Sequence, residues 1–125
     1  MSQSQSEPAG QGSVYLDIAV VAQGLCDMLG SKLVASMAGV KGPGQVRKWA
    51  RGDLEPTQPA QQRLRFAYDL LHGVEAAEGR NVTQAWATSV NPRLDYGTPL
   101  KAIREDRFQD AAAAAKALME DAYDG

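Results

Sequence analysis

The stretch Leu33-Val-Ala-Ser-Met-Ala-Gly-Val-Lys-Gly-Pro-Gly-Gln-Val-Arg-Lys-Trp-Ala-Arg-Gly52 contains the most decisive pattern in the chain. It predicts two short helices, over residues 32–38 and 43–50, joined by a turn that contains glycine. Gly39 can adopt the positive φ that a tight turn requires. Ala35, four residues earlier, is small enough for the two helices to approach closely, while Leu33 is expected to face the core. The stretch therefore predicts a helix-turn-helix unit.

The second helix of this unit has one apolar face and one basic face. Val46, Trp49 and Ala50 recur at helical spacing and are predicted to face inward. Residues near the N-terminus of a recognition helix read base edges, so the outward Gln45 and Lys48 are the predicted base contacts. Phosphate contacts are predicted for Lys32, Lys41, Arg47, Arg51 and Arg63, together with the hydroxyl of Ser31.

Charge is distributed unevenly along the chain, which has 13 basic and 15 acidic residues and a net charge of −2. Residues 31–65 contain seven basic and two acidic side chains, a net charge of +5, whereas the remainder carries −7. A basic segment inside an acidic protein attracts polyanions, which favours double-stranded DNA as a partner. The same charge pattern also suits a solvated helical face, or a basic surface that meets a protein partner.

Apolar periodicity predicts helices in the rest of the chain as well. We expect them over residues 16–29, 59–72 and 81–90, followed by a short helix from Pro99 and a last helix that carries the alanine run of residues 111–115. The alternating apolar residues at the start of the first segment also suit a strand, but the helical repeat that follows favours a helix. The fold class expected is therefore all-α.

Local signals predict where these helices begin and end. Gly30 and Gly73 are expected to end helices, and Ser31 is expected to cap the helix that follows it. Residues 76–79 are expected to connect two halves, and Asn81 to cap the next helix. The lone His72 then falls in the last turn of its helix, where a structural role is favoured over a catalytic one.

The length of 125 residues and an apolar content of 44% fit one small globular domain. We expect an N-terminal helix-turn-helix bundle that is continuous with a small C-terminal helical subdomain. Residues 1–13 are polar and expected to form a disordered arm. Residues 14–75 are assigned to the DNA-binding module, and residues 76–125 to the C-terminal subdomain.

The sequence gives no support to an enzyme. One cysteine and one histidine cannot form a Cys₂His₂ metal site, and the glycines of residues 39–44 lack the Gly-Lys-Ser/Thr of a phosphate loop. We therefore expect no catalytic residue, metal or cofactor. A single cysteine, Cys26, and the lack of a secretory signal or membrane span fit a cytoplasmic protein.

Several short motifs resemble the Xre/MbcA/ParS-type antitoxins. The N-terminal half carries Leu33-Val-Ala, Ala38-Gly-Val, Gln45-Val-Arg-Lys-Trp-Ala-Arg-Gly52 and Gln62-Arg-Leu-Arg-Phe-Ala-Tyr68, and the C-terminal half carries Ala85-Trp86, Asn91-Pro-Arg-Leu94 and Thr98-Pro-Leu100. The resemblance covers residues 16–122. It implies an all-α protein that binds its own promoter, represses its operon and neutralises a RES-domain toxin, which consumes NAD.

The resemblance also implies which residues meet the toxin, since in that family the C-terminal half contacts it and the chain end can cover its active site. The implied toxin-facing residues are Trp86, Asn91, Pro92, Leu94, Pro99, Met119, Asp121, Tyr123 and Asp124. Two alternatives stay open: residues 119–125 are an inert disordered tail, or the protein is a stand-alone helix-turn-helix regulator without a toxin.

A homodimer is the expected assembly. A single helix-turn-helix unit covers only a short DNA site, and specific recognition commonly uses two units related by symmetry. The apolar faces within residues 81–122 exceed what one small bundle needs. We therefore expect the dimer to form mainly through that part of the chain.

Overall fold

The computed structural model describes residues 16–124, with side chains as far as Asp121. The elements in order are α1 (Ile18–Leu29), α2 (Ser31–Ala38), α3 (Pro43–Arg51), α4 (Gln58–Glu78), α5 (Arg80–Thr88), the 3₁₀ turn η2 (Pro92–Leu94), α6 (Pro99–Arg104) and α7 (Phe108–Asp124). Within this part of the chain the β-type pairing is one isolated bridge, between Asn91 and Gly97. The all-α prediction is confirmed. The arm expected over residues 1–13 lies outside the described residues.

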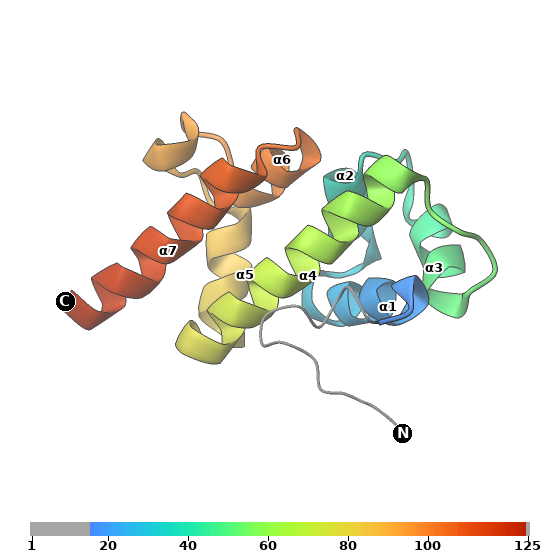
Figure 1. The fold of residues 1–125 in the computed structure, drawn as a ribbon, viewed down its shortest axis with the longest axis horizontal. Coiled ribbons are helices and arrows are strands. Elements are labelled where there is room, and N and C mark those ends of the chain that lie inside the picture. Colours follow the sequence, from blue (N-terminus) through green and yellow to red (C-terminus); the bar gives the residue numbers. More distant parts are fainter. Residues whose placement is uncertain (1–15, 125) are drawn as a thin grey trace, which may run out of the picture.

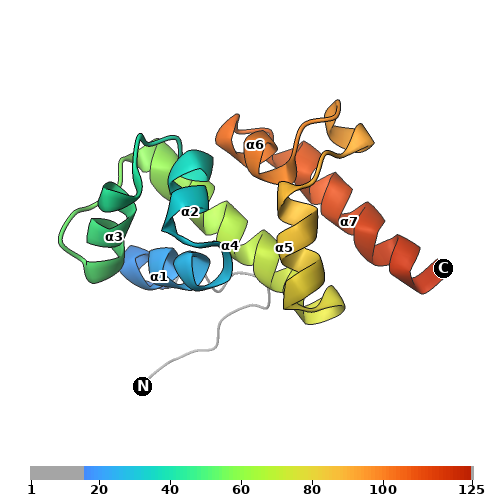
Figure 2. The same cartoon turned by 180° about the vertical axis from the view of Figure 1, so that it is seen from behind.

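The long helix α4 organises the molecule. It crosses the middle of the fold, with α1 to α3 on one side and α5 to α7 on the other (Figures 1 and 2). It contacts α1 and α2 on the first side and α5, α6 and α7 on the second. Leu64, Ala67, Leu71 and Val74 repeat at helical spacing along α4 and are fully buried. One helix therefore supplies core residues to both halves.

The core is continuous across these halves and includes residues from Ile18 to Ala114. The rings of Phe66 in α4 and Phe108 in α7 stack with their centroids 4.5 Å apart. The Gln84 side-chain amide in α5 donates a 2.7 Å hydrogen bond to the Met28 carbonyl near the end of α1. These contacts fix the C-terminal helices against the N-terminal ones.

The end of α4 differs from the prediction. Gly73 does not end the helix, which continues to Glu78 and stops at Gly79, where φ is +89°. Val74 is fully buried, and this packing outweighs the cost of about 1 kcal/mol for a glycine inside a helix. His72 therefore lies inside α4, and residues 76–78, predicted as a connector, are helical.

Two predicted caps are also wrong. Gly30 ends α1 as expected, but it is also the N-cap of α2, so Ser31 is the first helical residue and makes no capping bond. Gly79 has the same double role between α4 and α5, which places Asn81 inside α5. In both places a glycine with positive φ forms the whole connection and leaves no position for a capping side chain.

The buried face of α2 differs from the prediction in detail. Leu33 is 38% exposed, because the inward face of α2 consists of Val34, Ala35, Met37 and Ala38. In α7 the alanines that face the core are Ala111, Ala114 and Ala115. Leu33 is thus an apolar residue on the surface of α2.

Among the described residues, none of the helices is by itself both long and apolar enough to cross a membrane. Only α1 and α2 taken together reach the required length and composition, and this pair is bent by 119°.

Candidate nucleic-acid and partner interfaces

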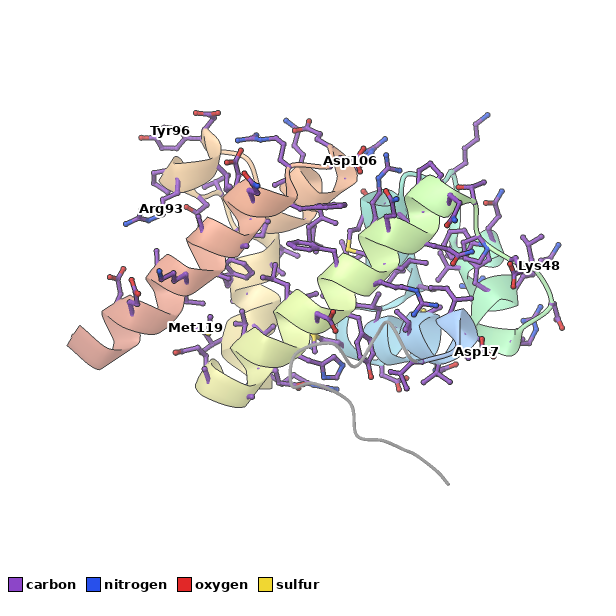
Figure 3. All side chains as sticks on the ribbon, in the orientation of Figure 1. Asp17, Lys48, Arg93, Tyr96, Asp106 and Met119 are labelled. Carbon is purple, nitrogen blue, oxygen red and sulfur yellow. The ribbon has the colours of Figure 1, made fainter. Side chains whose placement is uncertain are left out.

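Helix α3 exposes the face that the sequence assigns to DNA. Val46 and Trp49 are 0% and 2% exposed, and they fix the rotation of the helix against the core. The outward side chains are Gln45, Arg47, Lys48 and Arg51, all of which are exposed. Lys48 lies at the outer edge of the molecule, at the end opposite the C-terminal part of α7 (Figure 3). The arrangement leaves these polar groups accessible to a large ligand.

The turn between α2 and α3 brings these helices together. Gly39 has φ +86°, and its N–H donates to the carbonyls of Ala35 and Ser36 at 3.0 and 3.2 Å. Pro43 then begins α3, with Gly42 as its N-cap. A Cβ atom built on Gly42 or Gly44 would meet nothing within 4 Å, so the backbone at the front of α3 is open to close approach.

Three of the predicted phosphate contacts gather at the start of α2. Ser31, Arg47 and Arg51 line one hollow of about 330 Å³, together with Gln23, Cys26 and Ala50. Arg51 also pairs with Asp53 at 3.0 Å, but both side chains are more than half exposed and such a pair is weak. A hydroxyl and two cations from two helices therefore share one surface, which suits an anion. Lys32 and Lys41 are exposed on α2 and in the turn.

Arg63 does not belong to this surface. Its Nη1 donates to the Ala38 carbonyl at 2.9 Å, and its Nε and Nη2 donate to the Asp106 carboxylate at 2.9 and 3.2 Å. The Arg63 side chain is only 19% exposed. The hydrogen bond from Arg63 lowers the pKa of Asp106 below its ordinary value. The Arg63 guanidinium is thus occupied within the protein and is not available for the predicted phosphate contact.

Cys26 is not placed for nucleophilic chemistry. Burial raises the pKa of its thiol, Asp27 raises it further, and Arg47 opposes both effects. Within the described residues no three His, Cys, Asp or Glu side chains gather closely enough to hold a metal ion.

The candidate toxin contacts in the C-terminal half fall into two groups. Leu94 is 1% exposed and Pro99 is fully buried, while Trp86 is half-buried and packs against the core. These three residues stabilise the C-terminal helices. Asn91 and Pro92 shape the loop before α6, because the Asn91 side chain accepts a 2.9 Å hydrogen bond from the Arg93 N–H. Pro92 is exposed.

The same loop presents two exposed apolar side chains that are not among the predicted toxin contacts. Val90 is 69% exposed and Tyr96 is 71% exposed. Asp95 and Tyr96 both have positive φ, and the N–H of Tyr96 donates to the Asn91 carbonyl at 3.0 Å. The Asp-Tyr-Gly sequence of residues 95–97, which suits a turn, is the signal that could have indicated an exposed loop tip.

The end of the chain is helical rather than a separate tail. α7 runs to Asp124 and its last turns extend away from the other helices in both views (Figures 1 and 2). Met119 is half-buried and Asp121 is exposed. The side chains of Tyr123 and Asp124 lie outside the part of the chain whose side chains are described.

Comparison with known proteins gives a match in fold. No protein-family model matches the chain, and no curated protein matches it in sequence. A chain of the M. tuberculosis MbcT-MbcA toxin-antitoxin complex, solved by crystallography, matches with a TM-score of 0.69 and 23% sequence identity. The match covers 82% of this chain and 93% of that chain. The chain therefore shares the fold of a chain of this toxin-antitoxin complex, which is the type of system that the motifs resemble.

Proposed function

We propose that this protein is an antitoxin that binds double-stranded DNA through α2 and α3 and neutralises a RES-domain, NAD-consuming toxin through residues 76–125. It acts as a homodimer, represses its own operon and has no catalytic activity of its own. The observation that carries the antitoxin role is the shared fold with a chain of a toxin-antitoxin complex, over 82% of this chain.

The DNA-binding part of the proposal is supported by the surface of α3. Gln45 is exposed near the start of the helix, where a recognition helix meets base edges, and Lys48 is exposed in the last turn of the same helix. Arg47, Arg51 and Ser31 share a hollow beside them. This combination supplies base contacts and phosphate contacts on one side of the molecule.

The toxin-binding part of the proposal is supported by the projecting end of α7. Tyr123 is the proposed anchor, because aromatic side chains bury a large area at modest entropic cost. Asp121 and Asp124 would pair with the cationic groups that otherwise hold the phosphates of NAD. Asn91, Pro92 and Met119 would complete the contact.

The DNA-binding part is tested by measuring affinity for the upstream DNA of the gene at several salt concentrations. Lys48→Ala should relax sequence preference and cost about 1–3 kcal/mol at the preferred site. Arg51→Ala should weaken binding to all sequences alike and lower the salt dependence, because it removes a phosphate contact. If the wild-type protein shows no salt-sensitive binding to this DNA, the DNA-binding part is wrong.

The neutralising part is tested by removing residues 119–125. The alanines that anchor α7 to the core lie before this segment, so the shortened protein should fold and still bind DNA. It should fail to rescue cells that express the adjacent RES-type gene. Rescue by the shortened protein would show that another segment neutralises the toxin.

A stand-alone regulator is the second candidate. It is favoured by the position of the candidate base contacts, which lie in α3 alone and need no toxin. The neighbouring gene and co-purification of an endogenous partner separate the two functions. If the neighbouring gene does not encode a toxin and no toxin co-purifies, DNA binding would be the whole function.

A further inference from the structure

A second hollow, of about 560 Å³, lies between α2, the end of α5 and α6. It is lined by Leu33, Ser36, Thr88, Thr98, Leu100, Lys101, Arg104 and Glu105. Helices α2 and α6 are in direct contact, and both views show them as neighbours (Figures 1 and 2). The hollow therefore joins the first helix of the helix-turn-helix unit to the C-terminal half, and none of its residues belongs to the surfaces described above.

The α2 side of this hollow is part of the solvent-facing side of that helix. Lys32, Leu33 and Ser36 are exposed, while Ser31 is half-buried and the remaining residues of α2 face the core. In a helix-turn-helix protein the first helix crosses the DNA backbone while the second enters the major groove. The exposed face of α2 is the part of this helix that would pass closest to phosphates, and Leu33 and Ser36 lie on it.

The α6 side of the hollow supplies positive charge. The Lys101 Nζ lies 3.5 Å from Glu105, and Glu105 in turn lies 3.8 Å from Arg107. Arg104 is exposed and has neither an ion pair nor a side-chain hydrogen bond with the described residues. A guanidinium has the fork geometry that binds a phosphate through two hydrogen bonds. An unpaired arginine beside the helix that crosses the backbone is therefore placed for this contact.

We propose that Arg104 binds a phosphate of the DNA backbone in this hollow, assisted by Lys101 and the Ser36 hydroxyl. The inference rests on the proposed DNA binding by α2 and α3 and extends that interface into the C-terminal half. It also gives a role to basic residues in a part of the chain whose net charge is negative, where long-range attraction to DNA is weak.

The test compares Arg104→Ala with Arg93→Ala in the full-length protein. Arg93 is exposed, does not line the hollow and lies far from Lys48 in Figure 3, so it is not expected to contact the same DNA. Both variants replace an arginine by alanine and therefore change the net charge equally. Affinity for specific and unrelated duplexes is measured between about 50 and 200 mM salt. Arg104→Ala should lower the salt slope by about 0.9 and weaken both duplexes about three- to tenfold. Arg93→Ala should change neither, and Arg104→Lys should recover most of the slope.

Several results would overturn the inference. Equal losses for Arg93→Ala and Arg104→Ala would indicate a general charge effect. An unchanged salt slope for Arg104→Ala would contradict the phosphate contact and leave the proposed function intact. A loss of toxin binding without a loss of DNA binding would also contradict the contact, and would assign the hollow to a protein interface. Lack of DNA binding by the wild-type protein would overturn both proposals. If Arg104→Ala melts early, Arg104→Gln, which keeps the aliphatic stem, provides the comparison.

Discussion

Arg63 joins three segments that are distant in the sequence. From α4 it reaches Ala38, 25 residues earlier, and Asp106, 43 residues later. It lies in the basic stretch of residues 31–65, where its charge made a phosphate contact the natural interpretation. The sequence cannot distinguish it from Arg47, because both partners of Arg63 are set by tertiary packing. Lys48 and Gln45 were predictable as outward residues, since helical spacing from Val46 and Trp49 fixes their direction.

The ion pair of Arg63 with Asp106 predicts a specific dependence of stability on pH. Because Arg63 lowers the pKa of Asp106, the carboxylate stabilises the fold fully above its usual value of 3.8 and loses this contribution as pH falls through the lowered pKa. Asp106→Asn should therefore lower the Tm near neutral pH, and the difference from wild type should shrink below about pH 4. Glu55→Gln, which alters an exposed carboxylate in the loop before α4, is the control and should show a small difference throughout.

Trp49 is predicted to be the main anchor of α3. It is 2% exposed, so its replacement by alanine leaves a cavity. Trp49→Ala should destabilise the protein by about 3–5 kcal/mol in chemical or thermal unfolding. Leu54→Ala is the control, because Leu54 is 44% exposed and should change the free energy of unfolding by less than about 0.5 kcal/mol. Unchanged melting of Trp49→Ala would contradict the buried position of the indole.

At the scale of the helices, the sequence predicted those whose ends carry strong local signals. α3 begins at Pro43 and ends at Gly52 with φ +79°, so both boundaries were visible in the sequence. The end of α4 was not visible, because Gly73 is an equally strong local signal and only the burial of Leu71 and Val74 overrides it. The hollow beside α6 could not be predicted either, because the spacing of Leu33 in the sequence is that of a core residue.

Gly39 and Gly73 are expected to respond oppositely to alanine. A Cβ atom on Gly39 would lie 2.7 Å from the Arg63 Nη1, and its φ is +86°. Gly39→Ala should cost about 1–3 kcal/mol. A Cβ atom on Gly73 meets nothing within 4 Å inside α4, so Gly73→Ala should stabilise the protein by about 0.5–1 kcal/mol. Denaturant unfolding of both variants measures the two changes in the free energy of unfolding, and equal changes would contradict the prediction.

At the scale of the whole molecule, we expect a homodimer that forms through residues 81–122. Val82, Val90 and Tyr96 are 42%, 69% and 71% exposed in this region, and a dimer contact that covers them would remove their apolar surface from water. Light scattering over a concentration series should give twice the mass of one chain. Val90→Ser should shift the protein toward the monomer, whereas Leu54→Ser, outside this region, should not. A monomeric wild-type protein at all concentrations would contradict the dimer.

The sharing of α4 between the two halves has a consequence for turnover in the cell. Because one 21-residue helix contributes to the core on both sides, neither half keeps its packing when the other unfolds. A protease that captures the unfolded chain removes the proposed DNA-binding surface and the proposed toxin-binding surface in the same event. For the proposed function, the promoter and the toxin would then be released at the same rate, which is set by the unfolding of a single cooperative unit.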